Sequence, residues 1–341
     1  MKITLLDSET ALWDDFVLRQ PAARYPHLCG WKNVIEESFG HSCFYLMAKE
    51  NGAVHGILPL VHIRSRLFGS FLISLPFLNY GGIVAAHAEA QQSLFDSARD
   101  LATERGVAYI ELRHEAPLLD EAPTKQHKVT MRLDLPDDPE VLWNQLKSTV
   151  RTQIRKPTKL GLVVRFGREE ELANFYEVFS ANMRDLGTPV YAKKFFASIL
   201  RNFPASTWIC TVLMNGQPLA AGLVCGFRET LEIPWASSLR RYNSLAANML
   251  LYWSVLEFAV KKGFKCFDFG RCSPDEGTYK FKAQWGSKPA PLHWQYWLAN
   301  GHHMPDLSPK NDKYQLAIRL WQKLPLFVTR LVGPAIIRNI P

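Results

Sequence analysis

The sequence predicts an α/β (α+β) protein made of two tandem copies of one unit, followed by a helical C-terminal tail. Three observations carry this prediction. The chain has 341 residues, more than one hydrophobic core usually serves, and 47% of them are hydrophobic, which is enough for two cores. Two stretches repeat the same order of hairpin, helix and buried strand. The end of the chain has its own pattern of apolar and basic residues.

Each copy opens on a β-hairpin. The first, CFYLMAKENGAVHGILPLVHIRS, has Asn51-Gly52 between two apolar runs, and the second, TWICTVLMNGQPLAAGLVCGFRET, has Asn215-Gly216. Asn-Gly between apolar runs is a strong hairpin signal, because both turn residues need a positive φ. A further extended segment follows each hairpin.

Each copy closes on an amphipathic helix, a glycine and a short buried strand. The first reads LFDSARDLATERG and then VAYIELRH, with Gly106 ending the helix; the second reads MLLYWSVLEFAVKKG and then FKCFDFGR, with Gly263 in that place. Asn215 follows Asn51 by 164 positions, and Gly263 follows Gly106 by 157. Offsets this similar are hard to obtain by chance, so we interpret the sequence as an internal duplication.

The boundary between the copies is expected where LDLPDDP ends a strand and caps a helix from about Glu140. We therefore expect an N-terminal domain over residues 1–136 and a C-terminal domain, which would carry the active site, over residues 137–300. The tail would cover residues 301–341.

Positive charge is concentrated in two segments. The formal net charge is +8, yet residues 147–168 contain seven basic residues and no acidic one. From Lys310 to the end there are six basic residues and only one acidic residue, Asp312. This placement favours local sites for anionic groups and predicts no DNA partner. Pro157 and Gly161 are expected to interrupt the first basic segment.

The tail from Lys310 to Arg338 predicts a helix that Pro334 breaks. Its apolar positions are Leu316, Leu320, Leu324 and Phe327. The basic residues beside them are Arg319, Lys323, Arg330 and Arg338. Such a helix is typical of a segment packed across domains, and the pattern also allows peripheral contact with a membrane.

Composition and motifs exclude several classes of protein. The six cysteines form no CxxC pair and four lie in apolar stretches, which fits a reducing cytoplasm. The start, MKITLLDSETALWDDF, reaches charge too soon for a signal peptide, and no run is as long as a membrane span. The scattered histidines predict no metal site. Neither G-x-S-x-G nor a P-loop is present.

One long stretch resembles a known family. Residues 234–286, PWASSLRRYNSLAANMLLYWSVLEFAVKKGFKCFDFGRCSPDEGTYKFKAQWG, are similar to the C-terminal signature of FemAB-type proteins of the GNAT acyltransferase superfamily, in particular the exosortase/PEP-CTERM exopolysaccharide branch. SLPFLNYGGIV at 74–84, RTQIRKPTKLGL at 151–162 and NMRDLGTPVY at 182–191 resemble the same branch. The resemblance implies two tandem GNAT-like (acyl-CoA N-acyltransferase) domains and acyl or aminoacyl transfer to an amine.

The sequence departs from the wider superfamily at the donor site. Acyl-CoA enzymes carry a Q/R-x-x-G-x-G/A loop that holds pyrophosphate at a helix N-terminus, whereas the segment from Arg241 to Asn248 reads RYNSLAAN, without a glycine. The long helical hairpin that tRNA-using members can carry is also missing. The co-substrate, acyl-CoA or aminoacyl-tRNA, therefore stays open, and no tightly bound cofactor is expected.

The end of the last buried strand supplies the catalytic candidates. Lys282 in GTYKFK matches the lysine of the family's Tyr-x-Phe-Lys pattern, which the resemblance places near donor and acceptor, and Tyr279 would be a proton relay or simply pack its ring. Asp268 would orient an amine or accept its proton, and Arg271 would bind an acidic substrate or form a structural salt bridge with Asp268. Asn248 would meet a phosphate or an oxyanion at a helix N-terminus near Ala246, or would cap that helix.

Other polar residues are candidates for binding. Four basic residues at helical spacing would hold the phosphates of CoA or tRNA, although a solvated basic face has the same pattern: Arg151, Arg155, Lys156 and Lys159. The family's NMRDLGTPxY stretch would line the acceptor side with Asn182, Arg184 and Tyr191, and it also reads as a plain turn. Trp235 and Ser237 lie on a strand that is polar on one face.

Together these features predict a cytoplasmic N-acyl or N-aminoacyl transferase. Its basic tail also allows peripheral contact with the inner membrane. The acceptor would be an amino group of a sugar or of a lipid- or nucleotide-linked exopolysaccharide or peptidoglycan-like precursor. With no activated serine or cysteine in the sequence, attack would be direct. The alternative is a non-catalytic GNAT-fold protein that binds a polysaccharide precursor or a protein partner.

Overall fold

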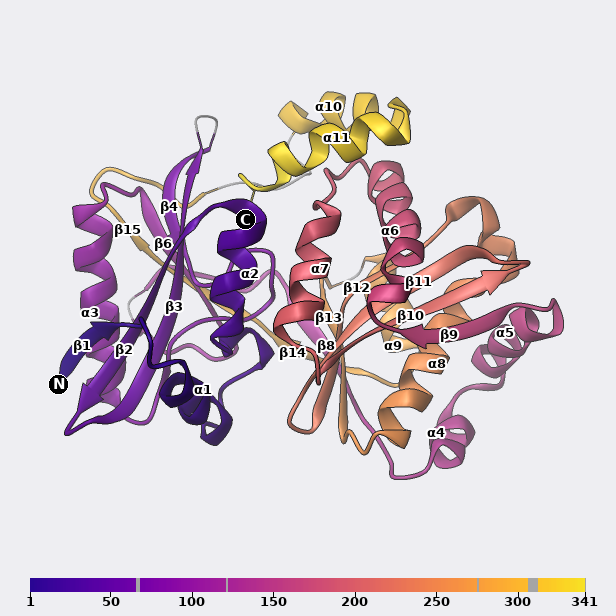
Figure 1. The fold of residues 1–341 in the computed structure, drawn as a ribbon, viewed down its shortest axis with the longest axis horizontal. Helices are drawn as coiled ribbons and strands as arrows, with labels where there is room; N and C mark the ends of the chain where they lie inside the picture. The colour runs from indigo at the N-terminus through magenta and orange to yellow at the C-terminus, as the bar shows by residue number, and fades with distance from the viewer. Residues whose placement is uncertain (66–67, 121, 275, 306–311, 341) are drawn as a thin grey trace. The chain divides into compact units, whose positions relative to one another are not determined.

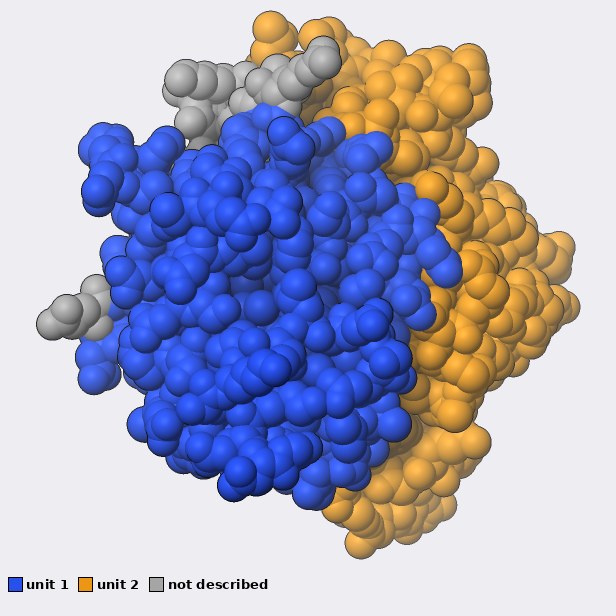
Figure 2. All heavy atoms as spheres, turned by 60° about the vertical axis from the view of Figure 1, so that its left-hand side comes forward, with its two compact units in different colours: residues 1–128, 291–306, 338–341 blue, residues 129–290, 307–337 orange. Residues whose placement is uncertain are grey.

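The computed structural model describes residues 1–65, 68–120, 122–274, 276–305 and 312–340. These residues form two compact units, coloured separately in Figure 2. Unit 1 comprises residues 1–128, 291–306 and 338–341, and unit 2 comprises residues 129–290 and 307–337. The units thus divide the chain differently from the expected 1–136 and 137–300, because each contains a segment from the other half of the sequence.

Unit 1 is built on an eight-stranded sheet within the described residues (Figure 1). Along the sheet the order is β1 (Lys2–Leu5), β2 (Ser42–Glu50), β3 (Ala53–Ser65), β4 (Gly69–Ile73), β6 (Tyr109–His114), β15 (His293–Leu298) and β7 (Thr124–Lys125), with β5 (Val84–Ala85) beside β3. Helix α3 (Ala88–Glu104) packs on this sheet through Ala90, Leu94, Ala98 and Ala102. Helices α1 (Thr10–Arg19) and α2 (Gly30–Phe39) contact β3 and β2.

Unit 2 repeats this arrangement in its own sheet of seven strands. Their order is β14 (Lys288–Pro291), β8 (Val129–Asp134), β13 (Cys266–Cys272), β12 (Thr230–Ser238), β11 (Gln217–Phe227), β10 (Thr207–Met214) and β9 (Val163–Gly167). Helix α8 (Ala247–Lys261) is apolar on most of its surface, because it lies between the sheet and α5 (Ser148–Lys159). The helices α6 (Leu172–Leu186) and α7 (Lys193–Asn202) also pack on this sheet, and the short helices are α4 (Pro139–Gln145) and α9 (Gly277–Ala283).

Both predicted hairpins are confirmed. Asn51 and Gly52 turn between β2 and β3 with φ of 50° and 83°, and Asn215 and Gly216 turn between β10 and β11 with φ of 51° and 79°. Left-handed residues at both positions match the right-handed twist of the strands that they join. Gly106 and Gly263 follow α3 and α8 with φ of 60° and 85°, as expected for glycines that end helices.

The two halves of the sequence exchange one strand each. β8 follows the first copy along the chain, yet it pairs antiparallel with β13 in unit 2. β15 follows the second copy, and it pairs antiparallel with β6 in unit 1. Each sheet is therefore completed by a strand from the opposite copy. No local sequence pattern predicts this exchange.

Two proline expectations were wrong. Pro157 does not interrupt the basic segment; it lies in the last turn of α5, which continues to Lys159 before Gly161 turns the chain. In the tail, Pro325 separates α10 (Asp312–Lys323) from α11 (Leu326–Ile337), and Pro334 lies inside α11. The predicted start of the tail helix, Lys310, lies outside the described residues.

Candidate functional site

The sheet of unit 2 opens where β12 and β13 separate. The two strands pair in parallel from Thr230 with Cys266 to Glu232 with Asp268. Beyond that point β12 continues to Ser238 paired with β11, whereas β13 continues to Cys272 paired with β8. Side chains at the point of separation therefore lie at an opening in the sheet, the kind of place where α/β proteins hold ligands.

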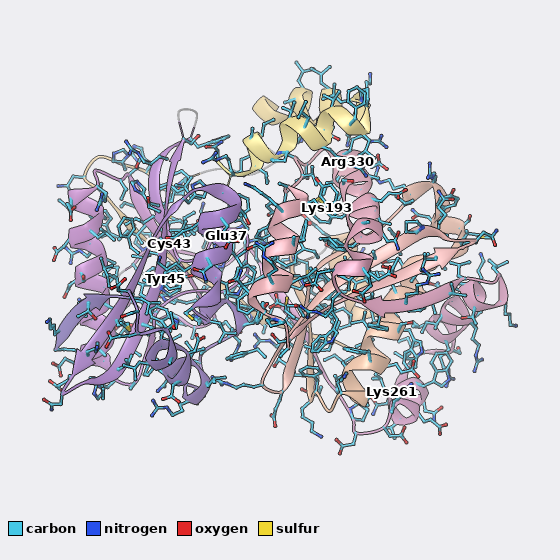
Figure 3. The ribbon with its side chains drawn as sticks, in the orientation of Figure 1. Glu37, Cys43, Tyr45, Lys193, Lys261 and Arg330 are labelled. Carbon is cyan, nitrogen blue, oxygen red and sulfur yellow. The ribbon has the colours of Figure 1, made fainter. Side chains whose placement is uncertain are left out.

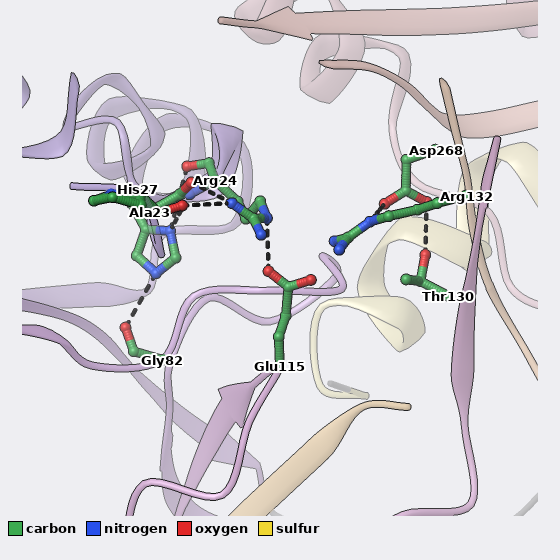
Figure 4. A network of polar contacts seen from close by, with 9 residues as sticks. Ala23, Arg24, His27, Gly82, Glu115, Thr130, Arg132 and Asp268 are labelled. Atoms are coloured by element: carbon green, nitrogen blue, oxygen red, sulfur yellow. Dashed lines mark hydrogen bonds and ion pairs between the residues drawn. The ribbon is translucent and has the colours of Figure 1, made fainter. Parts of the chain in front are cut away.

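Hydrogen bonds anchor Asp268 at this point, and Figure 4 draws those from Thr130 and Arg132. Its side chain is buried, with 1% of the residue exposed. Thr130 Oγ1 and the Gly270 backbone N–H donate to Oδ1 over 2.6 and 2.7 Å, and Arg132 Nε donates to Oδ2 over 3.2 Å. Because both oxygens are engaged, the Asp268 side chain is held in one orientation. Asp268 forms an ion pair with Arg132 of the exchanged strand β8.

A β-bulge brings Lys282 into the same place. The pairing of β13 with β8 shifts register between Asp268 and Arg271, and Gly270 adopts a φ of 75°, which glycine allows. Lys282 on α9 donates from Nζ to the carbonyl oxygens of Gly270 and Arg271 over 2.8 and 2.9 Å. Lys282 is thus an integral part of the bulge and not a solvated surface lysine.

Burial lowers the pKa of Lys282 from its usual value. The carboxylates of Asp268 and Glu232 act in the opposite direction. Only 7% of Lys282 is exposed. The amino group of Lys282 is therefore almost inaccessible to water and lies near the carboxylates of Asp268 and Glu232.

The sequence reasoning missed three residues of this cluster. Glu232 is buried in β12, directly beside Asp268 in the parallel register, and Thr130 and Arg132 arrive on β8. A single glutamate in the apolar run LEIPW was a usable signal for Glu232. No comparable signal existed for the two β8 residues, because the strand exchange brings them there.

The N-terminus of α8 lies directly after β12 and the 3-10 helix Arg240–Leu245. Asn248 is the second residue of α8 and half-buried, and the capping position belongs to Ala246, which makes no side-chain bond there. Ala246 has a φ of 57°, the left-handed conformation. The backbone therefore turns in a left-handed conformation directly before α8, at a residue that is not glycine.

The basic helix α5 borders a hollow of about 390 Å³. Arg155 and Lys159 line it together with Trp143 and Trp253. The Arg155 guanidinium lies 5.0 Å from the Trp143 ring centre, and the two tryptophan rings meet edge to face at 4.8 Å. Glu257 contributes one carboxylate to the lining. Cations and aromatic rings in one hollow suit a ligand with phosphates and a flat ring.

The other candidates are dispersed. On α5, Lys156 is exposed and Arg151 half-buried. Tyr279 is partly buried and packs its ring against the core of unit 2. Arg184 forms an ion pair with the adjacent Asp185 at 2.7 Å.

The predicted acceptor side contains one polar contact and an aromatic cluster. Asn182 Nδ2 donates to Ser237 Oγ over 3.1 Å, which joins α6 to the end of β12. Trp235 is buried, with Phe195 and Phe196 edge-on to its ring, so it serves the core. Tyr191 stacks in the same aromatic cluster. In the described part of the chain, no group of three or more His, Cys, Asp or Glu side chains is placed to hold a metal ion.

Comparison with known proteins defines the fold. Residues 144–283 match the family model described as an acetyltransferase (GNAT) domain. The crystal structure of FemX superposes with a TM-score of 0.70 at 14% identity, over 88% of this chain and 98% of that one. A tandem GNAT protein from the clavulanic acid biosynthesis pathway superposes with a TM-score of 0.54 at 14% identity, over 89% and 99%.

A third solved structure is also similar. L-PGS from Bacillus licheniformis superposes with a TM-score of 0.54 at 11% identity, over 88% of this chain and 95% of that one. No curated protein matches the sequence. The protein therefore consists of two tandem GNAT-like α/β units with a helical C-terminal tail, and the match to the acetyltransferase (GNAT) domain model lies within its second unit.

Proposed function

We propose that this protein is an N-acyl or N-aminoacyl transferase whose reaction takes place in unit 2. One observation carries the proposal. The segment that matches the acetyltransferase family contains a buried ammonium, Lys282, and an anchored carboxylate, Asp268, at the point where β12 and β13 separate. Buried charges of this kind are costly to fold around, and they are concentrated at functional sites.

The roles of the two charged groups follow from their bonds. Acyl transfer needs a positive charge near the carbonyl oxygen, which becomes negative as the amine attacks. Among the described residues, Lys282 donates two of its three N–H groups to the bulge carbonyls, and we assign the third to that oxygen or to a donor phosphate. Asp268 is a positioning residue, because its three bonds fix the bulge against which Lys282 is held.

The donor is an anionic co-substrate, acyl-CoA or aminoacyl-tRNA. The left-handed Ala246 and the N–H groups at the start of α8 offer a place for phosphate. One to three turns further along α8 lies the hollow beside α5, where Arg155 and Lys159 add cations next to two tryptophans. The co-substrate would bind reversibly and leave after transfer.

The acceptor is an amino group of a sugar or of a lipid- or nucleotide-linked exopolysaccharide or peptidoglycan-like precursor. This part of the proposal rests on the resemblance to the exosortase/PEP-CTERM branch of FemAB-type proteins. Asn182 and Ser237, bonded to each other at the end of β12, are the polar pair proposed to meet the acceptor.

The first experiment separates the two donors. Calorimetry would measure the binding of acetyl-CoA and of charged tRNA to the protein and to a variant with Arg155→Gln and Lys159→Gln. The expected result is binding of one donor, with at least about tenfold weaker binding by the variant, since two charge-assisted contacts are lost. Binding of neither donor, or equal binding by both proteins, contradicts the donor site.

The second experiment tests turnover. Transfer of a labelled acyl group to amino sugars and to lipid-linked precursors would be followed by mass spectrometry. The bonds of Lys282 to two carbonyls also suit a binding protein that has lost catalysis. Retention of a precursor with no product for the bound donor would favour that alternative over the transferase.

A further inference from the structure

The C-terminal helices α10 and α11 are attached to unit 2 along one side. Thr329 and Gly333 of α11 are buried, and a side chain at Gly333 would meet the backbone of Val190 at 2.8 Å. Arg330 donates from Nε to Ser180 Oγ of α6 over 2.9 Å. Figure 3 labels Arg330 on α11 and Lys193 at the start of α7. The orientation of both helices on α6 is therefore fixed by packing.

The opposite side of the two helices exposes large apolar side chains. The exposed fractions are 68% for Leu316, 58% for Leu320, 72% for Phe327 and 79% for Leu331. These residues are spaced by four within each helix, so each pair lies on one face. A row of strongly exposed leucine and phenylalanine side chains is unfavourable in water and indicates a contact surface.

Positive charge accompanies this row. Arg319 and Lys323 are exposed on α10, each three positions after one of the leucines. The charges of the tail itself are mainly positive, since Asp312 is the single acidic residue between Lys310 and the end of the sequence.

We propose that this surface binds the face of an anionic phospholipid bilayer. Apolar side chains would enter the boundary of the acyl chains, and the cations beside them would meet lipid phosphates. A second copy of the chain fits less well, because its identical surface would bring like charges together. Among the described helices, none has the length and apolarity to cross a bilayer, so the contact is peripheral.

Vesicle flotation tests the proposal with the full chain. Wild-type protein is expected to float with vesicles of phosphatidylglycerol and phosphatidylcholine and to bind phosphatidylcholine alone more weakly. A variant with Leu316→Ser, Leu320→Ser, Phe327→Ser and Leu331→Ser is expected to lose at least about tenfold in partition coefficient, since four apolar side chains no longer enter the lipid. Arg319→Gln with Lys323→Gln is expected to weaken binding to the anionic vesicles alone, by several-fold.

Two controls keep the result interpretable. Leu12 and Leu18 are exposed on α1 at 44% and 54%, and Leu12→Ser with Leu18→Ser removes a comparable apolar pair elsewhere, so vesicle binding should be unchanged. Thermal unfolding should be unchanged in every variant, because the altered side chains are exposed. Wild-type protein that does not float, or a fourfold serine variant that floats equally, overturns the proposal. So does a wild-type dimer that the serine variant converts to monomer without any vesicle binding.

Flotation needs neither donor nor acceptor, so failure of the transferase proposal would not affect this test. If the acceptor is lipid-linked, which rests on the proposed function, the same surface would bring unit 2 to its substrate.

Discussion

The two units place an acidic residue at the same point of their sheets and use it differently. Glu111 of β6 and Asp268 of β13 each end the parallel pairing with the preceding strand, β4 or β12. Each faces a residue of the exchanged strand in the antiparallel register, Tyr296 of β15 or Arg132 of β8. The duplication has therefore preserved a buried carboxylate together with a partner from the opposite half of the sequence.

In unit 1 the strand beyond this point is bonded to a neighbouring segment of the chain. Arg113 pairs with Glu111 at 2.8 Å and donates to the carbonyl oxygens of Leu75 and Leu78, so the segment SLPFLNYGG is tied to β6. Tyr296 completes the cluster with a 2.7 Å bond to Glu111. In unit 2 the corresponding position to Arg113 is Gly270, whose carbonyl receives Lys282. One carboxylate thus binds Arg113 and Tyr296, and the other anchors the bulge that holds Lys282.

The largest expected effects on stability come from two single variants, each of which neutralises one of these carboxylates. Glu111→Gln leaves Arg113, 1% exposed, without its counter-charge, and should lower the free energy of unfolding by about 3 to 5 kcal/mol. Asp268→Asn should lower it less, by about 1 to 3 kcal/mol, because Arg132 keeps a side chain that is 26% exposed and can reach water. Urea denaturation would measure both.

Asp268→Asn should reduce turnover more than Glu111→Gln does, the reverse of their order in stability. Under conditions where both variants are folded, Glu111→Gln should retain transferase activity, whereas Asp268→Asn should lose most of it because the bulge that holds Lys282 is no longer anchored. Equal loss of activity in both variants would mean that the two carboxylates have the same structural role.

The next largest effect is expected at low pH, which should destabilise unit 1 more than unit 2. All ten histidines lie in segments of unit 1. Burial lowers the pKa of His114 to about 4, and the ring accepts a bond from the Ile83 N–H, which requires a neutral nitrogen. Because the unfolded chain binds a proton near pH 6.5 and the folded one does not, stability is lost as pH falls from 6.5 to 4, by about 3 kcal/mol for this group.

Hydrogen exchange followed by mass spectrometry, corrected for intrinsic rates, would test this difference. Peptides from unit 1 should lose protection between pH 7 and pH 5 before peptides from unit 2. Burial lowers the pKa of His41 and His62 as well, so they act in the same direction. Simultaneous loss of protection in both units would show that they unfold together.

The sequence predicted the fold well because its signals are local. Asn-Gly turns, glycines after helices and apolar periodicity gave the hairpins, the helices and the duplication. Lys282 was a candidate because it matches a family motif, and Asp268 because it ends a buried strand; the structure places both beside the bulge, and their roles stay predictions. Arg132, Thr130 and Tyr296 were not recognisable, because the strand exchange that positions them is a long-range event with no local signal. Trp235 and Tyr191 lie in an aromatic cluster that the sequence could not predict, because the aromatic residues of a binding motif and of a core look alike in sequence. Their binding roles stay predictions.

Lys282 provides a test of which unit carries the chemistry. Lys282→Met should lower turnover by about 10²-fold, which corresponds to about 2.7 kcal/mol of transition-state stabilisation. Lys280→Met on the same helix is the matched control, because Lys280 is exposed and should be dispensable. Steady-state kinetics would measure both, with thermal unfolding to establish that each variant is folded. Full activity of Lys282→Met would remove this residue from the site.

The smallest expected effect concerns the backbone at the start of α8. Ala246 has a φ of 57°, a conformation that costs an L-residue with a Cβ about 1 kcal/mol, whereas glycine adopts it freely. Ala246→Gly should therefore raise the free energy of unfolding by up to about 1 kcal/mol and should preserve donor binding, because the loop keeps its course. Ala246→Val should do the opposite on both counts, since a β-branched side chain tolerates this conformation poorly. Urea denaturation together with calorimetry of the donor would read the two effects. If Ala246→Val weakened stability but left donor binding intact, the start of α8 would serve only the fold, and the donor would have to be held by the hollow beside α5 alone.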